Sequence, residues 1–367
     1  MEKKIENKIS SPARFGSVMA VSGALLLYGL VLNVNSGSVS IPAGEIFSLL
    51  LDWLLCALRS VFTGLEYSAE FEKLKMLSTE SRILFSIRLP RMLLAAILGG
   101  ALSVSGFLLQ CFFRNPIAGP FVLGISSGAK MLVGLTMIIL ARYMSGINSA
   151  VLILASFAGS LLISLVVLGF SQRLRQMSTL LVIGIMVGYV CSAVTDFIIS
   201  FANDHEIVNL TNWSMGTFSG ANWENVKTAA LLCLPAVLAA WGLAKPMAAY
   251  ALGEGYAKSM GINIKAFRAA LILLSSLLSA CVTALAGPVS FVGVAVPHIT
   301  RSLLKSSKPA YVIPASFLCG AVFCIFCDLI ARIVFAPTEL AIGTVTSAFG
   351  APVVISMMAR KRMSQEL

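Results

Sequence analysis

Long apolar runs separated by short polar turns occupy most of the chain, from about residue 15 to residue 359. A helix needs about 20 apolar residues to cross the hydrocarbon core of a bilayer. The pattern therefore predicts an all-α, polytopic membrane protein with about ten transmembrane helices. The expected spans are residues 15–33, 88–110, 120–140, 149–170, 179–201, 226–244, 266–286, 289–304, 310–334 and 339–359.

These spans predict a single transmembrane domain that covers residues 1–367, because they leave no room for a separate soluble domain. Residues 1–14 run straight into a long apolar span and the start lacks a small-residue cleavage site, so they are expected to be a cytoplasmic tail before a retained span rather than part of a cleaved signal peptide. Residues 34–87 are expected to form an extended outer segment. Its amphipathic stretch 46–62 contains one Asp and one Arg, which favours a helix along the membrane interface. A full crossing there would invert the topology of every later span.

Charged residues make up only 12% of the sequence and hydrophobic residues 58%, whereas a soluble domain carries about 25% charged residues. The net charge of +11 would suit a nucleic-acid partner, but Lys and Arg of membrane proteins also gather in cytoplasmic loops. Most of the 27 basic residues fall in loops on the side of the two termini. We therefore expect a multi-pass protein of the cell (inner) membrane, in contact with lipid, with both termini cytoplasmic and no nucleic-acid partner.

Motifs for catalysis or metal binding are weak in this sequence. All cysteines but Cys56 lie inside apolar runs, where cysteine behaves as a small hydrophobe. Cys324 and Cys327 have CxxC spacing, but a second pair and a neighbouring histidine are lacking. The G-x-S-x-G motif at 124–128 lies in an apolar helix rather than after a strand. We expect no catalytic residue, no metal site and no cofactor.

Five segments carry longer and more specific motifs. They are RLPRMLLAAILGGALSVSGFLLQCFFRNPIAGPFVLGISSGAK (88–130), WSMGTFSGANWENV (213–226), ALGEGYAKSMGI (251–262), GPVSFVGVAVPHITRSL (287–303) and CDLIARIVFAPTELAIGTVTSAFGAP (327–352). Together they resemble, at corresponding places along the chain, the permease subunits of iron-chelate and cobalamin ABC importers (FecCD-type). One departure is Ala341, where the family usually has proline in its E-L-P-x-G run.

The resemblance implies a transport subunit rather than an enzyme, which passes an iron chelate (a ferric siderophore or haem) from an extracytoplasmic binding protein into the cytoplasm. Cobalamin is the alternative substrate within the same family. The sequence contains no G-x-x-x-x-G-K-[ST] phosphate-binding loop, so ATP hydrolysis is expected in separate cytoplasmic ATPase subunits. A second permease copy is also implied. One complete copy favours a homodimer, and a heterodimer with a paralogue remains open.

A mixed polar and apolar stretch, residues 245–268, interrupts the spans on the cytoplasmic side. It can form short helices with one apolar face, joined by glycine turns. The resemblance implies that this stretch is the coupling loop that contacts the ATPase. The alternative is a plain solvated connector. The residues implied to contact the ATPase are Leu252, Gly253, Glu254, Ala257, Met260 and Gly261.

Three arginines lie near the outer ends of spans. Arg88 and Arg91 begin the second span and Arg332 ends the ninth. Charges at such positions are costly and usually functional. The resemblance makes all three candidates for docking to carboxylates of the binding protein, which the planar guanidinium pairs well. Alternatively, Arg332 pairs with Asp328 one helical turn away, and the other two arginines anchor at lipid headgroups.

Two turns are implied to form the cytoplasmic gate, because the family places constrictions in these regions. Asn115 and Ile117 belong to the turn after the second span, and Met177, Ser178 and Thr179 lie at the entry to the fifth. A purely structural role for each turn is the alternative.

The competing function from another class is a secondary transporter driven by an ion gradient. Such a protein needs charged residues at the middle of the membrane and broken helices that form an ion site. Asp196 is the only clear acidic residue near the middle of a span, which makes this alternative the weaker one. A polytopic membrane enzyme is weaker still, because the sequence lacks a clustered set of His, Asp or Glu.

Overall fold

The computed structural model describes residues 11–36, 78–121, 123–139, 149–173 and 177–363, together with residues 44, 48 and 51. The interfacial helix expected at 46–62 lies almost entirely outside these ranges, as do residues 1–10 of the expected tail. Within the described ranges every regular element is a helix, so the all-α prediction is confirmed.

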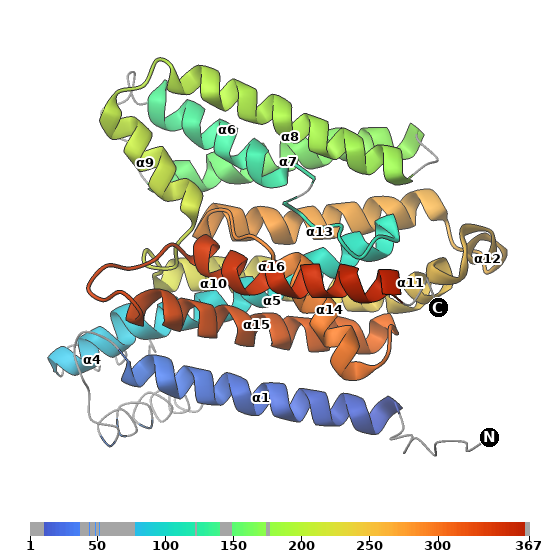
Figure 1. Ribbon diagram of the computed structural model, residues 1–367, viewed down its shortest axis with the longest axis horizontal. Helices are drawn as coiled ribbons and strands as arrows, with labels where there is room; N and C mark the ends of the chain where they lie inside the picture. The colour runs from blue at the N-terminus through green and yellow to red at the C-terminus, as the bar shows by residue number, and fades with distance from the viewer. Residues whose placement is uncertain are drawn as a thin grey trace, which may run out of the picture.

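The helices follow the chain in the order drawn in Figure 1. They are α1 (Ser11–Asn35), α4 (Thr79–Ile83), the π-helical turn η1 (Leu84–Arg88), α5 (Leu89–Phe113), α6 (Ile125–Ile138), α7 (Ser149–Arg173), α8 (Met177–Ile199), α9 (Asp204–Met215), α10 (Trp223–Gly242), α11 (Ala244–Leu252), α12 (Glu254–Ser259), α13 (Ile264–Ala286), α14 (Val292–Leu304), α15 (Pro309–Ile333) and α16 (Ile342–Met363).

Each of the ten expected spans corresponds to one of these helices. In the described part of the chain, seven helical stretches are long and apolar enough to cross a bilayer, and α6 and the apolar part of α16 are shorter apolar helices. α14 has 13 residues, in keeping with the short eighth span expected from the sequence. The polytopic architecture is therefore confirmed.

The second span begins earlier than the sequence suggested. Residues 79–113 form one continuous apolar helical stretch, whereas the expected start was residue 88. Pro90 lies inside this stretch and has no N–H with which to continue the α-helical ladder. The chain forms a π-helical turn just before it, in which the Leu89 N–H donates to the Leu84 carbonyl oxygen. Pro90 therefore follows a π-helical turn inside a longer helix, and it does not lie in the first turn of that helix.

The third span is shorter than expected. Residues 120–140 were predicted to be helical, but α6 begins at Ile125. Gly124 precedes it with φ +73°, a left-handed conformation that favours glycine. A Cβ added to Gly124 would lie 2.7 Å from the Cα atom of Gly188 in α8. This glycine therefore lets the turn approach α8 closely before α6 begins.

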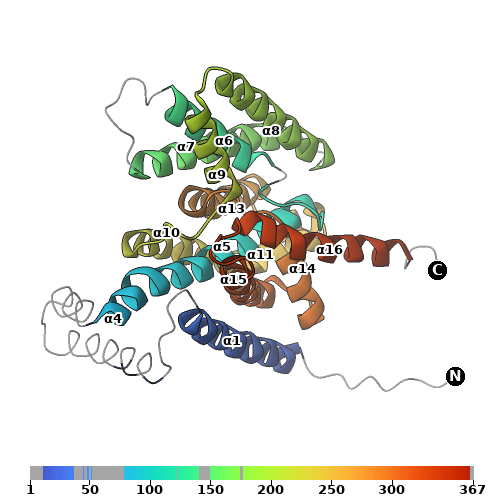
Figure 2. The same cartoon turned by 60° about the vertical axis from the view of Figure 1, so that its left-hand side comes forward.

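α5 forms the centre of the bundle (Figures 1 and 2), with α1 at one edge and α7 and α8 at the opposite edge. α5 is buried along most of its length, whereas little of α1 is buried. Small residues bring the neighbours of α5 close. A Cβ on Gly106 would lie only 1.7 Å from the Gly293 carbonyl oxygen of α14, so α5 and α14 touch backbone to backbone.

The two ends of the bundle carry different elements. α1 starts and α16 finishes at the end that also holds α11 and α12, whereas α4, α9 and the loop between α15 and α16 lie at the other end (Figure 1). The described ends of the first and last helices thus lie on one side, as the even number of expected spans requires. We call the end with α11 and α12 the coupling end, and the other end the outer end.

Candidate functional sites at the two ends of the bundle

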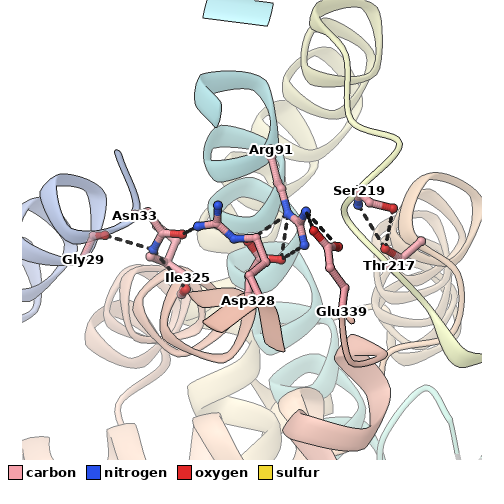
Figure 3. A network of polar contacts seen from close by, with 9 residues as sticks. Gly29, Asn33, Arg91, Thr217, Ser219, Ile325, Asp328 and Glu339 are labelled. Atoms are coloured by element: carbon pink, nitrogen blue, oxygen red, sulfur yellow. Dashed lines mark hydrogen bonds and ion pairs between the residues drawn. The ribbon is translucent and has the colours of Figure 1, made fainter. Parts of the chain in front are cut away.

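An ionic network joins three helices at the outer end. The Arg91 guanidinium of α5 donates from Nε and Nη2 to the Asp328 carboxylate of α15 over 2.9–3.1 Å. Its Nη1 donates to both carboxylate oxygens of Glu339, each at 3.0 Å. Glu339 lies in the loop between α15 and α16. Arg91 therefore uses its planar fork on two carboxylates at once (Figure 3).

Arg332 extends this network toward α1. Its Nε lies 3.4 Å from Asp328 Oδ2, which makes the two side chains an ion pair. The two atoms are not aligned for a hydrogen bond, and Nε has no hydrogen-bond partner in the structure. Its Nη2 donates to the Asn33 side-chain oxygen of α1, and the Asn33 amide donates in turn to the carbonyl oxygens of Gly29 and Ile325. The i,i+4 pair that the sequence offered as an alternative is thus present.

The three predicted docking arginines come together, but none of them is an exposed side chain, and that of Arg332 is only 12% exposed. Arg88 and Arg91 are both buried; Arg88 also donates to the Val34 carbonyl oxygen at the end of α1. Asp328 is only 1% exposed, whereas the Glu339 side chain is 44% exposed. Glu339 is therefore the member of the network that solvent reaches most easily.

The coupling end carries exposed apolar side chains, in contrast to the buried charged side chains of the outer end. α11 and α12 form the short helices expected in 245–268, and Gly253 between them has φ +140°. Gly261, with φ +80°, lies in the turn that follows α12. The helices bury Ala257 but leave Leu252, Tyr256 and Met260 at 72%, 50% and 59% exposure. The predicted apolar face therefore divides into a small buried side and a larger exposed one.

Glu254 attaches α12 to the rest of the bundle. Its carboxylate lies 2.9 Å from Arg268 Nη2 of α13 and 3.2 Å from Lys258 Nζ one turn along α12. The Arg268 side chain is largely buried and that of Lys258 is exposed. The pair with Arg268 is thus the one that positions α12.

The two predicted gate turns lie at the coupling end. The Asn115 side-chain oxygen accepts a hydrogen bond of 3.1 Å from the Ile117 N–H, and the Asn115 carbonyl oxygen accepts one of 3.2 Å from the Ala118 N–H. This Asx turn fixes the chain after α5. Met177 is the first residue of α8, and Ser178 and Thr179 follow it with exposed side chains.

Several residues of both sites were not singled out from the sequence. Glu339, Asn33 and Arg268 are the partners of predicted residues, yet each lies far along the chain or on another helix. The acidic residue of the T-E-L-A run was the one available signal for Glu339. Among the described residues, no group of three or more His, Cys, Asp or Glu side chains is arranged to hold a metal ion.

The chain matches the model of the FecCD transport family over residues 17–360. It is 34% identical over 301 residues to the vitamin B12 import system permease protein BtuC of Vibrio parahaemolyticus, covering 82% of this chain and 89% of that protein. It is 33% identical over 325 residues to the hemin transport system permease protein HmuU of Yersinia pestis, covering 86% and 95%.

A solved structure shares the fold. It is described as an inward-facing conformation of a metal-chelate type ABC transporter; it superposes with a TM-score of 0.78 at 23% identity and covers 94% of this chain and 99% of that one. The family match spans nearly all of the described bundle, including both ends. The chain therefore belongs to the FecCD transport family, whose members are permease subunits of ABC importers, as its motifs indicated.

Proposed function

We propose that this chain moves an iron chelate, a ferric siderophore or haem, across the cell (inner) membrane, using energy from a separate ATPase. The observation that carries the proposal is the exposed apolar row of Leu252, Tyr256 and Met260 at the coupling end. An exposed apolar patch next to a charged rim is typical of a protein-binding surface. Glu254 and Lys258 supply the rim here. A solvated connector would have no need of these three side chains.

The ATPase subunits would bind this row in the cytoplasm, with Leu252, Gly253, Glu254, Ala257, Met260 and Gly261 as the coupling residues. Gly253 and Gly261 set the angle at which the two helices are presented, because their positive φ values are strained for other residues. In this arrangement both termini are cytoplasmic, consistent with the start of α1 and the end of α16 at the same end of the bundle (Figure 1).

An extracytoplasmic binding protein would dock at the outer end. A carboxylate from that protein could form a two-pronged bond with Arg91 only by replacing one already bound to it. Glu339 is the replaceable one, because it is much more exposed than Asp328. Docking through Arg88, Arg91 and Arg332 is therefore proposed as an exchange of carboxylates, not as a simple contact with an exposed basic patch.

A second permease copy, in a homodimer, would complete the transport path. α8 supports this proposal with a long exposed apolar face, made of Val182, Met186, Tyr189, Val190, Val194 and Phe197. The gate turns at Asn115 and Ile117, and at Met177, Ser178 and Thr179, lie near the end of that path in the proposal. A heterodimer with a related chain would use the same face.

Cobalamin is the second candidate substrate. The names of the similar proteins favour it as much as haem, since one imports vitamin B12 and another hemin. The experiment is co-purification of the tagged chain from its native membrane, followed by transport in proteoliposomes with the recovered partners. Haemin, a ferric hydroxamate chelate and cyanocobalamin would each be offered with and without ATP.

ATP-dependent uptake of one of the two iron chelates supports the proposal, and uptake of cyanocobalamin alone assigns the other substrate. Recovery of the chain without any ATPase, with uptake abolished by a protonophore, would overturn the proposal in favour of a secondary transporter.

A further inference from the structure

We propose that Arg114 and Tyr250 form the mechanical link between the coupling helices and the gate turn at 115–117. Arg114 is then a positioning residue, which acts by holding α11 to the end of α5. The inference rests on the proposed function, because it assumes that an ATPase moves α11 and α12. It adds the route by which that movement reaches the gate.

Two contacts join the Arg114 side chain to the same residue of α11. Nη2 donates a hydrogen bond of 2.7 Å to the Tyr250 carbonyl oxygen. The guanidinium carbon also lies 4.6 Å from the centroid of the Tyr250 ring, within the range of a cation–π interaction. A side chain held through both the backbone and the ring of its partner has little freedom to slide along it. The contact therefore transmits displacement in more than one direction.

Tyr250 is well placed to report movement of the coupling helices. It lies in the last turn of α11, two residues before the exposed Leu252. Its carbonyl oxygen also accepts the Gly253 N–H at 3.1 Å, and a cation at the carboxyl end of a helix is electrostatically favoured. The Tyr250 side chain is buried, with its ring 5.3 Å from that of Phe267 in α13. A push on Leu252 therefore reaches Arg114 through a packed residue.

Arg114 is equally well placed to move the gate turn. It ends α5 with φ +49°, a left-handed conformation that is uncommon for a residue other than glycine. Its N–H donates to the Cys111 carbonyl oxygen at 3.4 Å, and the Asx turn of Asn115 and Ile117 follows directly. Such a backbone conformation persists where the surroundings fix it. Tyr250 is one such fixing contact, so a change in α11 changes the direction in which the turn leaves α5.

α12 has a different anchor, which separates the two halves of the coupling loop. The Glu254–Arg268 pair ties α12 to α13, whereas Arg114 ties α11 to the end of α5. Gly253, with φ +140°, separates the two helices, so each is held to the bundle by its own side-chain anchor. The gate turn is thus coupled to α11 in particular.

The test is hydrogen exchange, followed by mass spectrometry, of the full complex of permease and ATPase in lipid nanodiscs, with and without ATP plus vanadate. In the unaltered complex, nucleotide should change the exchange of peptides covering 244–262 and of peptides covering 110–121. In Arg114→Met the first change should persist and the second should be lost. Lys308→Met, which removes an exposed cation at the start of α15, should keep both.

Tyr250→Leu removes the ring but keeps the carbonyl acceptor, and it should reduce the change at 110–121. This variant also serves if Arg114→Met fails to assemble with the ATPase. Retention of the full change at 110–121 in either assembled variant would overturn the link while leaving the proposed function intact. If nucleotide does not change the hydrogen exchange of peptides covering 244–262 in the unaltered complex, the result contradicts the proposed function. The proposed link between Arg114 and Tyr250 would then be wrong as well, because it depends on that function.

Discussion

Asp328 at the outer end is buried between two arginines, whereas Leu252 at the coupling end is among the most exposed apolar side chains of the described chain. The outer end satisfies its charges internally, through bonds among α1, α5, α15 and the loop that leads to α16. The coupling end leaves the apolar side chains of Leu252, Tyr256 and Met260 exposed. The two ends therefore differ in the interactions that a binding partner would have to form or replace.

A partner at the coupling end has only to cover apolar surface, which is favourable by about 25 cal/mol for each Å² removed from water. A partner at the outer end has to displace a carboxylate from Arg91 before it gains an equivalent bond. Affinity at the coupling end should therefore depend on shape and apolar area. Binding at the outer end should depend on the balance between competing carboxylates.

The largest expected effect is on stability, from Asp328→Ala. Removing this carboxylate leaves Arg91 and Arg332 without the buried anion that lies between them. Removing one partner of a buried ion pair lowers the free energy of unfolding by about 3–5 kcal/mol. The measurement is the free energy of unfolding in detergent, from denaturant titration. Asp196→Ala, which removes an exposed acidic residue of α8, is the control. A loss below that of the control would show that the network does not hold the outer end together.

The next largest effect is on assembly with the ATPase. Leu252→Asp together with Met260→Asp places two charges in the proposed contact and should weaken association by about 2 kcal/mol or more, since buried apolar contacts at interface centres carry most of the binding free energy. Both side chains are exposed in the free permease, so its own stability should change little. Titration of the purified ATPase against permease in nanodiscs measures the affinity. Unchanged affinity would exclude this row as the contact.

The helices of this protein could be predicted largely because each apolar run has to satisfy its backbone within itself when it crosses a membrane. The boundaries were harder. The sequence predicts that the second span starts at residue 88, close to Pro90, but a π-helical turn accommodates this proline within a longer helix. At Gly124 the apolar run continues while the helix does not, since a left-handed residue separates them. Composition alone does not distinguish an apolar turn from an apolar helix.

The candidate sites were predicted less completely, for a related reason. The Arg332–Asp328 pair was available from helical periodicity, because its members are four residues apart. The Arg91–Asp328 and Arg91–Glu339 pairs join residues separated by 237 and 248 positions, and their proximity depends on how α5 packs on α15. The sequence therefore suggests docking arginines that bond to a partner protein, and it does not indicate that Arg91 pairs with Asp328 and Glu339.

A smaller effect is expected at the glycine between α11 and α12. Gly253 has φ +140° and ψ 150°, a conformation that is nearly restricted to glycine, and Gly253→Ala should cost about 1–3 kcal/mol of local strain. The chain can relieve this strain by turning α12, so affinity for the ATPase should fall while the outer end stays intact. Gly255→Ala is the matched control. Gly255 is helical and a Cβ there meets nothing within 4 Å, so the control should keep its affinity.

The smallest expected effect comes from Glu339→Gln, and it tests the outer end directly. The Glu339 side chain is 44% exposed, so its ion pair with Arg91 contributes only about 0–1 kcal/mol to stability. Asp328 remains bonded to Arg91 in the variant, which should fold as well as the unaltered chain. Its affinity for the binding protein should nevertheless rise, because the carboxylate that competes for Arg91 is gone. Surface plasmon resonance of the two proteins at low and high salt measures this change. A fall in affinity would instead mean that Glu339 itself contacts the binding protein, and that the outer end binds without any exchange of carboxylates.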